Sequence, residues 1–446
     1  MKKRVVSMLL VCSILFLMLP ANVFAAETVT NFAQLKAALE NPSIDVINFG
    51  ANIAMERDRN IIISPNKTGL TINGNGYQLV QNDYLSGSYA IQFDCSKSNI
   101  QHMVFNNLYL SGQTRKGFLN IPNNPRNPDF TVVFNNVKYD GPELISARYS
   151  NVVLNNCEIL VTPTTTDTNG YFVTGTNITL SGDVKFTKQS ETSNRTLFYV
   201  YNKGALTIAS RANVVIQNET DQRVAKKAGF ANFMTSVTKL VFEDYSSFEY
   251  YGTSAFLYGA DVGEVHVGRS ANVFILVVGN LSNTNGLLGI KSSMTVNNEA
   301  RVYIIAASNT NAYPVIRIAG ASSFTFNSPR EVLIYNASWK TNGNGLAIYV
   351  PTAFTFTFND IREVDYYQLS RSPYNSLGTP TYRFANDNGS MYSVSYGMNS
   401  PLFSAYSLKV LSSYRYTGST PFTSASLKDM NIIRISNRSS SGGITD

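Results

Sequence analysis

Cysteine is scarce in this chain of 446 residues, which contains three copies. Cys12 lies in an N-terminal segment, which leaves Cys95 and Cys157 for the rest of the chain. Because at most one disulfide can form between them, the fold cannot be a disulfide scaffold, and its stability must come from a hydrophobic core. We expect both to be small buried apolar residues, and the sequence leaves a Cys95–Cys157 bridge open.

Histidine and charged residues are also few. His102 and His266 are the two histidines, a small stock for a metal enzyme or a nucleophilic enzyme. Only 15% of residues are charged, and runs of helix-forming residues are nearly absent. Aromatic residues reach 12%, and Asn, Ser, Thr and Gly are abundant, which favours an all-β protein rich in turns.

The N-terminal segment has the features of a secretory signal. Lys2, Lys3 and Arg4 precede an uncharged apolar run at 5–19, and small residues at 23 and 25 predict cleavage after Ala25. A membrane anchor would need about 20 apolar residues, more than this run contains. We therefore expect residues 1–25 to be a signal peptide, and the protein to be secreted, extracellular or associated with the cell wall, with no transmembrane anchor in the mature chain.

The net charge argues against a nucleic-acid partner. The chain carries 36 basic and 29 acidic residues, and three of the basic residues belong to the signal. The remaining excess is small for a chain of this length, whereas a dedicated nucleic-acid binder has a strongly basic face.

A repeat runs along most of the chain. Each copy is a short β-branched or aromatic strand that ends at an apolar anchor residue and is followed at once by turn-forming residues. The anchors are Ile72, Phe105, Phe134, Leu154, Leu180, Ile208, Phe242, Val267, Val296, Phe326 and Phe358. A second strand follows most turns, at 77–80, 108–110, 137–139, 159–161, 273–278 and 302–306. Strand, bend, strand and variable loop together predict one coil of a solenoid.

The geometry of the bends between strands accounts for the residues found in them. Asn and Gly tolerate the left-handed backbone of a sharp corner, and stacked Asn side chains can hydrogen-bond along the axis. Three residues after the anchor, Leu108, Val137 and Cys157 in successive copies predict an inward apolar stack. A propeller or a sandwich would require hairpins, and the sustained single repeat favours the solenoid over them.

The two ends of the repeat differ from its middle. Residues 31–40 predict a capping helix, with Phe32, Leu35 and Leu39 on one face, Thr30 or Asn31 at its start and Pro42 after it. Past Phe358 the repeat fades, and 361–436 predict a C-terminal cap or a small β module, followed by a flexible tail at 437–446. The expected organisation is thus a signal at 1–25 and a parallel β-helix at 26–360 before that module.

The start of the expected β-helix resembles a known family. The stretch FAQLKAALENPSIDVINFGANI at 32–53, the stretch IIISPNKTGLTINGNGYQLV at 61–80 and the VFNN and VLNN coils resemble the pectate-lyase-like adhesive domain of secreted and surface proteins of Gram-positive bacteria. The resemblance covers roughly 29–360. It implies a right-handed parallel β-helix and a role in adhesion.

No residue pattern predicts a catalytic, cofactor or metal site. Enzymes of this shape need carboxylates that converge on successive coils, to hold Ca²⁺ or to act as acid and base. The corners carry mostly Asn, Ser and Gly instead. The remaining candidates are better explained as corners, strand residues or solvated loops: Glu243-Asp244, Asn359-Asp360, the Asn-Gly pairs at 73–76, Arg371-Ser372-Pro373, Glu56-Arg57-Asp58-Arg59, His102 and His266.

The best surface candidates are the C-terminal tyrosines, although packing within a β module explains them better. They are Tyr366, Tyr367, Tyr374, Tyr382, Tyr392, Tyr396, Tyr414 and Tyr416. The sequence therefore predicts a non-catalytic adhesin that contacts a polysaccharide, a matrix protein or a cell-wall polymer through unidentified residues. The alternatives are a polysaccharide lyase or glycoside hydrolase acting on uronate polymers, and a purely structural envelope component.

Overall fold

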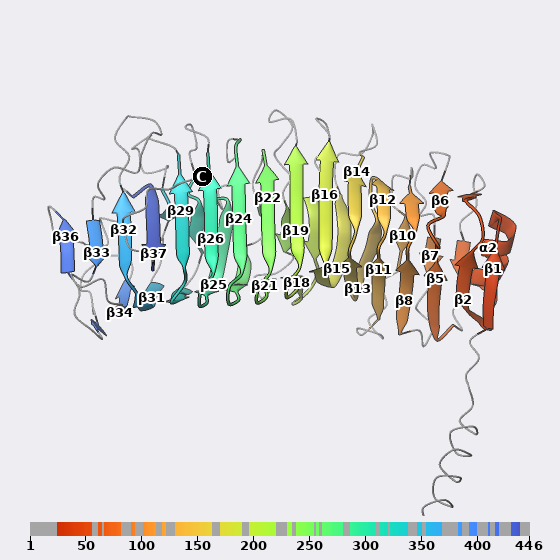
Figure 1. Ribbon diagram of the computed structural model, residues 1–446, viewed down its shortest axis with the longest axis horizontal. Coiled ribbons are helices and arrows are strands. Elements are labelled where there is room, and N and C mark those ends of the chain that lie inside the picture. The colour runs from red at the N-terminus through yellow and green to blue at the C-terminus, as the bar shows by residue number, and fades with distance from the viewer. Residues whose placement is uncertain are drawn as a thin grey trace, which may run out of the picture.

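The structure is a computed structural model. It describes the strands, the corners and some of the loop residues. It describes residues 25–437 with the exception of 56–60, 65–66, 82–90, 94–100, 113–117, 122–129, 163–169, 190–195, 220–229, 234–237, 254–255, 258–260, 280–285, 308–312, 320–321, 338–345, 350–353, 368–381, 386–391, 399–408, 411–414 and 419–429. These residues form an elongated all-β solenoid with little helix (Figure 1).

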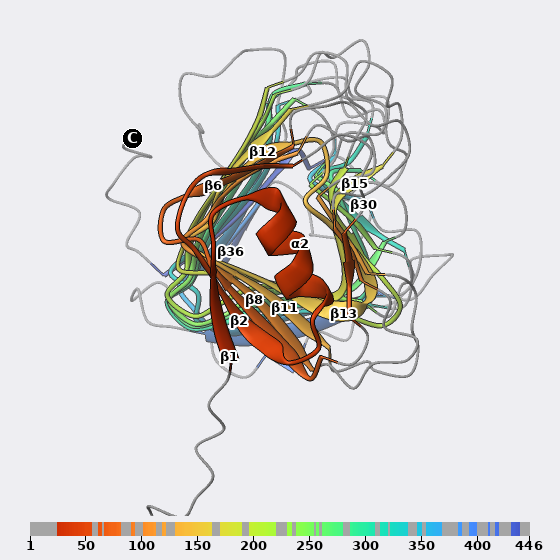
Figure 2. The same ribbon diagram turned by 90° about the vertical axis from the view of Figure 1, so that its right-hand side faces the viewer.

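Three ladders of stacked strands form the walls of the solenoid, and together they enclose a triangular interior (Figure 2). Ladder 1 contains the anchors. It comprises β2 (Ile44–Phe49), β5 (Gly69–Asn73), β8 (His102–Asn106), β11 (Thr131–Asn135), the second parts of β13 (Ile145–Asn155) and β15 (Tyr171–Ser181), β18 (Ala205–Ile208), β21 (Lys239–Phe242), β23 (Val262–Val267), the second part of β25 (Leu288–Val296), β28 (Ser322–Asn327) and β31 (Phe354–Ile361).

Ladder 2 follows each anchor corner, and ladder 3 lies between the variable loops. Ladder 2 comprises β3 (Ile53–Met55), β6 (Gln78–Gln81), β9 (Tyr109–Ser111), β12 (Lys138–Gly141), β14 (Glu158–Val161), β16 (Asp183–Gln189), β19 (Asn213–Glu219), β22 (Ser247–Gly252), β24 (Asn272–Val277), β26 (Arg301–Ala306) and β29 (Glu331–Asn336). Ladder 3 comprises β4 (Ile61–Ile63), β7 (Ile91–Phe93), β10 (Leu119–Asn120), the first parts of β13, β15 and β25, β17 (Thr196–Val200), β20 (Ala231–Phe233), β27 (Ile316–Ile318) and β30 (Ile348–Tyr349).

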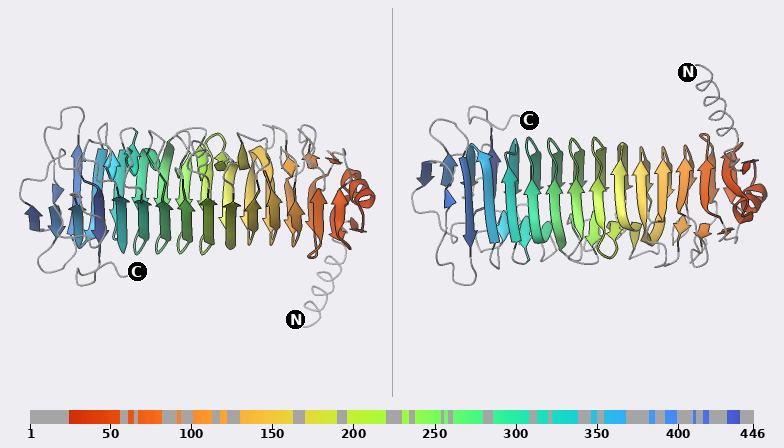
Figure 3. Two further views of the ribbon diagram at one scale, coloured as in Figure 1. Left: turned by 90° about the horizontal axis from the view of Figure 1, so that it is seen from above. Right: turned by 90° about the horizontal axis from the view of Figure 1, so that it is seen from below.

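The register of ladder 1 confirms the predicted repeat. All the anchors from Ile72 to Phe358 pair with one another in sequence order, through parallel strands. The strands predicted after the corners are also present, in ladder 2. The repeat begins one coil earlier than predicted, because Ile47 pairs with Ile72. Figure 3 shows the parallel arrows of two walls from opposite sides.

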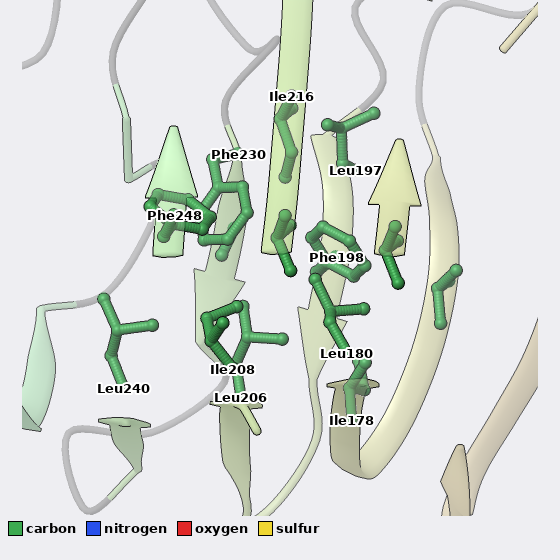
Figure 4. Packing of buried hydrophobic residues seen from close by; sticks show 14 of the residues in the cluster. Ile178, Leu180, Leu197, Phe198, Leu206, Ile208, Ile216, Phe230, Leu240 and Phe248 are labelled. Carbon is green, nitrogen blue, oxygen red and sulfur yellow. The ribbon is translucent and has the colours of Figure 1, made fainter. Parts of the chain in front are cut away.

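Alternation along each strand builds one continuous core. In β11 the side chains of Val132 and Phe134 are fully buried, whereas those of Val133 and Asn135 are half-buried and point outward. Phe105 and Phe134 stack across neighbouring coils, with ring centroids 5.0 Å apart. Such pairs add about 0.5–1.5 kcal/mol to the free energy gained by burial. Figure 4 shows the same layering of Leu, Ile and Phe in the middle coils.

The corners between ladders 1 and 2 contain the predicted Asn stack. The side-chain amide of Asn106 donates to Asn73 Oδ1 at 2.9 Å, and that of Asn135 donates to Asn106 Oδ1 at 2.9 Å. Asn48 and Asn155 extend this row, and Asn297, Asn327 and Asn359 form a second one. These Asn side chains are half-buried. Because their amide groups bond one another along the axis, they are not left without hydrogen-bond partners, which would destabilise the fold.

The left-handed corner residue is asparagine or glycine only in part of the chain. Asn107, Asn136, Asn156 and Gly182 have φ values of 49, 52, 53 and 63°. Four wider corners instead place Arg211, Tyr245, Ser270 and Glu299 at φ values between 56 and 63°. The prediction that Asn or Gly occupies this conformation is wrong at these four corners and at Ser328 and Asp360. In the four wider corners the turn is one residue longer, and small residues such as Ala271 and Ala300 fill its inside.

A helix covers the N-terminal end of the core. α2 (Phe32–Glu40) begins after Asn31, whose side chain accepts a hydrogen bond from the backbone N–H of Gln34 at 3.0 Å. Phe32, Leu35 and Leu39 are buried, as the helical spacing predicts. Figure 2 shows α2 lying across the triangular opening, next to β1 (Ala25–Val29) and β2.

The described C-terminal strands extend the walls of the solenoid. β32 (Glu363–Tyr367) and β37 (Ile432–Ser436) continue ladder 2, and β37 lies between β29 and β32, antiparallel to both. β33 (Tyr382–Ala385) and β36 (Arg415–Gly418) add two further antiparallel strands to that wall. β34 (Tyr392–Met398) and β35 (Lys409–Val410) extend ladder 1 in the same manner.

Two smaller expectations can be compared with the structure. Cys157 is free and buried, and its surroundings raise the pKa of the thiol to about 11 through burial, whereas Cys95 lies outside the described residues. Asn437 was expected to begin a flexible tail, yet its side chain bonds Ser328, Asp360 and the backbone N–H of Arg362. Residues 438–446 lie outside the described part, and so do residues 1–24 of the expected signal.

Candidate binding surface

The two histidines lie on the same wall but far apart. His102 in β8 and His266 in β23 are exposed outward residues of ladder 1. Five strands of that ladder, β11, β13, β15, β18 and β21, are stacked between them. The Asn297 side-chain amide lies 3.3 Å from His266 Nε2. The structure thus does not bring the histidines together.

The corner carboxylates bind backbone groups of neighbouring coils. Glu243 Oε2 accepts a hydrogen bond from the N–H of Ser210 at 2.8 Å, and Asp244 Oδ1 accepts one from the N–H of Arg269 at 2.7 Å. Asp360 occupies a left-handed corner position. These acids stabilise corners. The charged loop at 56–59 and the motif at 371–373 lie outside the described residues.

Three carboxylates do converge on the outer side of the ladder 2 wall, which the sequence analysis did not anticipate. Glu331 of β29 and Glu363 and Asp365 of β32 are buried. Arg383 forms a two-point ion pair with Asp365, with Nε–Oδ1 and Nη2–Oδ2 distances of 2.7 and 2.9 Å. Arg434 of β37 donates to Glu331 Oε1 at 3.0 Å and lies 3.8 Å from Glu363 Oε1. We call these five residues the acid–arginine cluster.

The acid–arginine cluster has the properties of a structural network. Its guanidinium groups form ion pairs with the carboxylates. Tyr303 adds a hydrogen bond to Glu331 Oε2 at 2.7 Å. Burial, and then the negative charge of Asp365, raise the pKa of Glu363. Within the described part of the chain, no group of three or more His, Cys, Asp or Glu side chains is arranged to hold a metal ion.

The C-terminal tyrosines that can be placed are packing residues. Tyr366 points into the core and is 1% exposed, and Tyr367 packs with Leu333 and Ile432 on the other side of the wall. Burial raises the pKa of Tyr367 to about 12. The side chains of Tyr374, Tyr382, Tyr392, Tyr396, Tyr414 and Tyr416 lie outside the described residues.

The outward rows of the three walls differ in chemistry. Ladder 1 presents a row that is mostly Thr and Val and that continues to His266: Thr71, Val104, Val133, Val153, Thr179, Thr207, Val241 and His266. Ladder 2 presents ion pairs such as Lys138–Glu158 at 3.0 Å, and apolar residues further along. Ladder 3 aligns hydrogen-bonding and aromatic residues in register: Asn120, Ser146, Thr174, Tyr199 and Asn232, then Gly289, Arg317 and Tyr349. Thr174 and Gly289 are buried, and the others reach the surface. Ladder 2 also carries outward aromatic rings, since the ring centroids of Tyr251 and Phe274 are 5.5 Å apart. Among the described residues, ladder 3 differs by bringing four tyrosine rings together.

Four tyrosines, Tyr149, Tyr171, Tyr199 and Tyr201, lie together beside the bend from ladder 3 into ladder 1. The rings of Tyr171 and Tyr199 stack with centroids 4.1 Å apart and planes 16° apart. The ring of Tyr201 lies edge-on to those of Tyr199 and Tyr149, at 6.1 and 5.1 Å. All four are half-buried, so each ring is fixed by packing and still reaches the surface. We call these four tyrosines the Tyr cluster.

Polar groups surround the Tyr cluster. The side-chain amide of Asn232 donates to Tyr171 Oη at 2.9 Å, and the hydroxyls of Tyr149 and Tyr201 lie 3.4 Å apart. The exposed Arg148 guanidinium lies 5.9 Å from the centroid of the Tyr201 ring, a cation–π distance. The hydrogen bond with Tyr201 raises the pKa of Tyr149, and burial raises that of Tyr199. The phenols of Tyr149 and Tyr199 therefore stay protonated and remain available as donors and acceptors.

A second polar group lies further along the same row. Asp261 Oδ1 lies over Gly289, where any added Cβ would come within 2.0 Å of it. Arg317 Nη1 is 3.9 Å from this oxygen, and burial raises the pKa of Asp261 while Arg317 and Lys291 lower it. The next residue in the row, Tyr349, is 42% exposed. We call Asp261, Arg317 and Tyr349 the Arg317 group.

Neither the Tyr cluster nor the Arg317 group is predicted from the sequence, because the residues of ladder 3 lie in stretches that the repeat assigns to variable loops. Tyr149, Tyr171 and Tyr199 come from three coils, and only the ladder 3 register aligns them. One signal was present: tyrosine recurs at 149, 171 and 199, at spacings close to that of the repeat.

Comparison with known proteins supports the resemblance found in the sequence. Residues 26–146 match the family model described as "Putative pectate lyase-like adhesive domain", a shorter stretch than the 29–360 expected. A solved chain described as L. reuteri 53608 SRRP is 18% identical over 68% of this chain and 98% of its own, with a TM-score of 0.42. A second SRRP, 100-23, is 16% identical over 69% and 86%, with a TM-score of 0.39. These two likenesses are too distant to carry function. No curated protein matches the chain.

Proposed function

We propose that this protein is a non-catalytic adhesin of the cell exterior and that the Tyr cluster is its contact surface. The observation that carries the proposal is the outward position of four packed tyrosines, two of them stacked, on strands of a rigid wall. Tyrosine supplies a large contact area with an apolar body and a polar tip, and it loses little conformational entropy on binding. The ligand classes that fit are a polysaccharide, a matrix protein or a cell-wall polymer.

The family match supports adhesion, because the matched model describes an adhesive domain. The absence of catalysis is part of the proposal. It is supported by the way the described carboxylates are used: Glu243 and Asp244 bind corner backbone, and Glu331, Glu363 and Asp365 bind arginine and tyrosine side chains.

The finer features of the fold also belong to the proposal. Winding of the coils is expected to be right-handed, as in nearly all parallel strand crossovers. We assign capping roles to α2 at one end and to the antiparallel strands at the other, because open solenoid ends expose strand edges and core.

Export is supported by the signal-like segment and by the position of β1. Within the described residues, no helix is long and apolar enough to cross a membrane. Ala26 pairs with Val46 at the edge of the first coil, so cleavage after Ala25 would leave a chain that enters the fold at once. N-terminal sequencing of protein collected outside cells should give Ala26 as the first residue. Retention of residues 1–25 in the mature protein would contradict export by this route.

The contact surface can be tested by retention of the purified protein on bacterial walls, matrix proteins and immobilised polysaccharides. A Tyr199→Ala/Tyr201→Ala variant should lose at least about tenfold in affinity for whichever surface retains the parent, as expected for aromatic hot spots. The matched control is Tyr77→Ala, which removes a 37% exposed tyrosine from a corner outside ladder 3.

Two results would count against the proposal. Equal losses in both variants, or no loss in either, would show that the Tyr cluster is not the contact. Turnover of a uronate polymer, with or without Ca²⁺, would show an enzyme instead of a non-catalytic adhesin. Circular dichroism of each variant separates loss of binding from loss of fold.

A further inference from the structure

The Tyr cluster and the Arg317 group lie along one line on one wall. In ladder 3 the outward position of Tyr199 is in register with that of Asn232, and Arg317 is in register with Gly289 and Tyr349. Between them, Ala231 pairs with Leu257, and the N–H of Leu257 donates to Leu287 O next to β25. The backbone of the wall is therefore continuous along the solenoid axis between the two groups.

The spacing of the two groups sets the length of a ligand that could contact both. Four ladder steps separate Tyr199 from Arg317, through β20, Leu257, β25 and β27. At about 4.8 Å a step, the two side chains originate about 19 Å apart. Because both are on short strands of one rigid sheet, this separation is fixed.

The chemistry of the row favours a narrow ligand rich in hydroxyls. The described residues of the row that reach the surface are Asn120, Ser146, Tyr199, Asn232, Arg317 and Tyr349. None is aliphatic, whereas a stable protein interface buries about 800 Å² a side around an apolar core. A sugar ring instead offers a C–H face to an aromatic ring, and hydroxyls to amide, carboxylate and guanidinium groups.

Nucleic acid could also stack on tyrosine, but it requires a basic groove along the backbone. At one end of the line Arg317 and Lys291 both act on Asp261, and at the other end Arg148 lies beside the Tyr cluster, so the cations described along the line are few and far apart. This charge balance favours a carbohydrate.

We propose that ladder 3 binds a linear carbohydrate chain that lies along the solenoid axis and contacts the Tyr cluster and the Arg317 group together. The proposal rests on the proposed adhesive function and deepens it, because it names the ligand class and the direction of the chain. Two weak contacts joined in one polymer give an affinity well above that of either contact alone.

The experiment measures binding of the full chain to a panel of linear neutral and uronate polysaccharides, and then to a length series of whichever polymer binds. Oligomers longer than about 19 Å should bind about a hundredfold more tightly than shorter ones. Arg317→Ala should reduce the affinity for long oligomers to about that for short ones and leave short-oligomer binding unchanged. Tyr199→Ala should weaken binding at both lengths, and Tyr77→Ala at neither.

The outcomes separate this inference from the adhesive function. Tyr199-dependent binding to matrix proteins with no carbohydrate bound would overturn the carbohydrate proposal and leave adhesion standing. Equal affinity for short and long oligomers, or no effect of Arg317→Ala, would overturn the extended binding mode. Tighter binding of a single-stranded oligonucleotide would assign the row to nucleic acid. If no surface retains the protein through Tyr199, both proposals fail.

Discussion

At the scale of single residues, the wider corners hold their backbone in an unfavourable conformation. Arg211, Tyr245, Ser270 and Glu299 have positive φ, which costs an L-residue other than glycine roughly 1–2 kcal/mol. Corners with Asn107 or Gly182 avoid much of this cost. The wider corners must be stabilised by their packing, because residues such as Ala271 and Ala300 are fully buried inside them.

Glu299→Gly should therefore raise the free energy of unfolding by about 0.5–1 kcal/mol, since relief of the strained φ exceeds the extra chain entropy lost by glycine. Denaturant unfolding checks the change. The matched variant Glu299→Ala removes the same side chain without relieving φ and should give no gain. A gain for alanine as large as that for glycine would show that backbone conformation is not the cause.

Glu363 makes stability depend on pH in a defined direction. Burial, followed by the charge of Asp365, raises its pKa above the ordinary value of 4.5, while Arg383 and Arg434 oppose the shift. The folded protein therefore keeps this proton to a higher pH than the unfolded chain, and the resulting stabilisation is lost as pH rises through the folded pKa.

Glu363→Gln cannot ionise, so its stability relative to the parent should increase as pH rises above 4.5 and level off above the folded pKa. Unfolding midpoints of the two proteins between pH 4 and pH 8, a window around the ordinary carboxyl pKa, test this. A difference that is constant across that range would contradict the assignment of the titration to Glu363.

At the scale of elements, the nine-residue helix α2 packs its buried face against the N-terminal end of the core. Leu35 is fully buried against the first coils, so Leu35→Ala should lower the free energy of unfolding by about 2–4 kcal/mol. It should also increase self-association, because the end of the core becomes accessible. Denaturant unfolding and size-exclusion chromatography measure the two effects. Glu40→Gln, on the exposed face of the same helix, should change either by little.

β37 is held between β29 and β32 by backbone pairing and by Arg434. Arg434→Met should destabilise the protein by about 3–5 kcal/mol, because Glu331 and Glu363 lose their buried cation. Adding Glu363→Gln to this variant should restore part of the loss, since one of the two carboxylates that lose Arg434 is then neutral. Thermal unfolding of the single and double variants decides the point, and strictly additive losses would argue against coupling.

At the scale of the whole molecule, the sequence predicts the solenoid well and the candidate binding surface on ladder 3 poorly. Ladder 1 is predictable because each anchor is followed by a corner whose Asn or Gly residues have a clear physical role, as at Phe105 and Phe134. Ladder 3 is not, because strands of two or three residues such as Leu119–Asn120 have too little periodicity to be distinguished from loops.

The same limit applies to the candidate site and to the C-terminal end. Tyr149, Tyr171 and Tyr199 become neighbours only when three coils are aligned through ladder 3. The acid–arginine cluster requires β37 to run antiparallel between two strands that both precede it, and nothing in Ile432–Ser436 reveals its partners. Both features depend on contacts distant in sequence, which local patterns do not encode.

The position of β37 has a consequence for the order of folding. The coils can stack one after another as the chain emerges, since each pairs with the coil before it. β32 cannot pair with β29 in that order, because the place between them belongs to a strand that is synthesised later. Until β37 arrives, Glu331 and Glu363 remain hydrated and the wall stays interrupted. The rate of this last insertion, and not the stacking of coils, should therefore determine how long a newly synthesised chain is exposed to proteases.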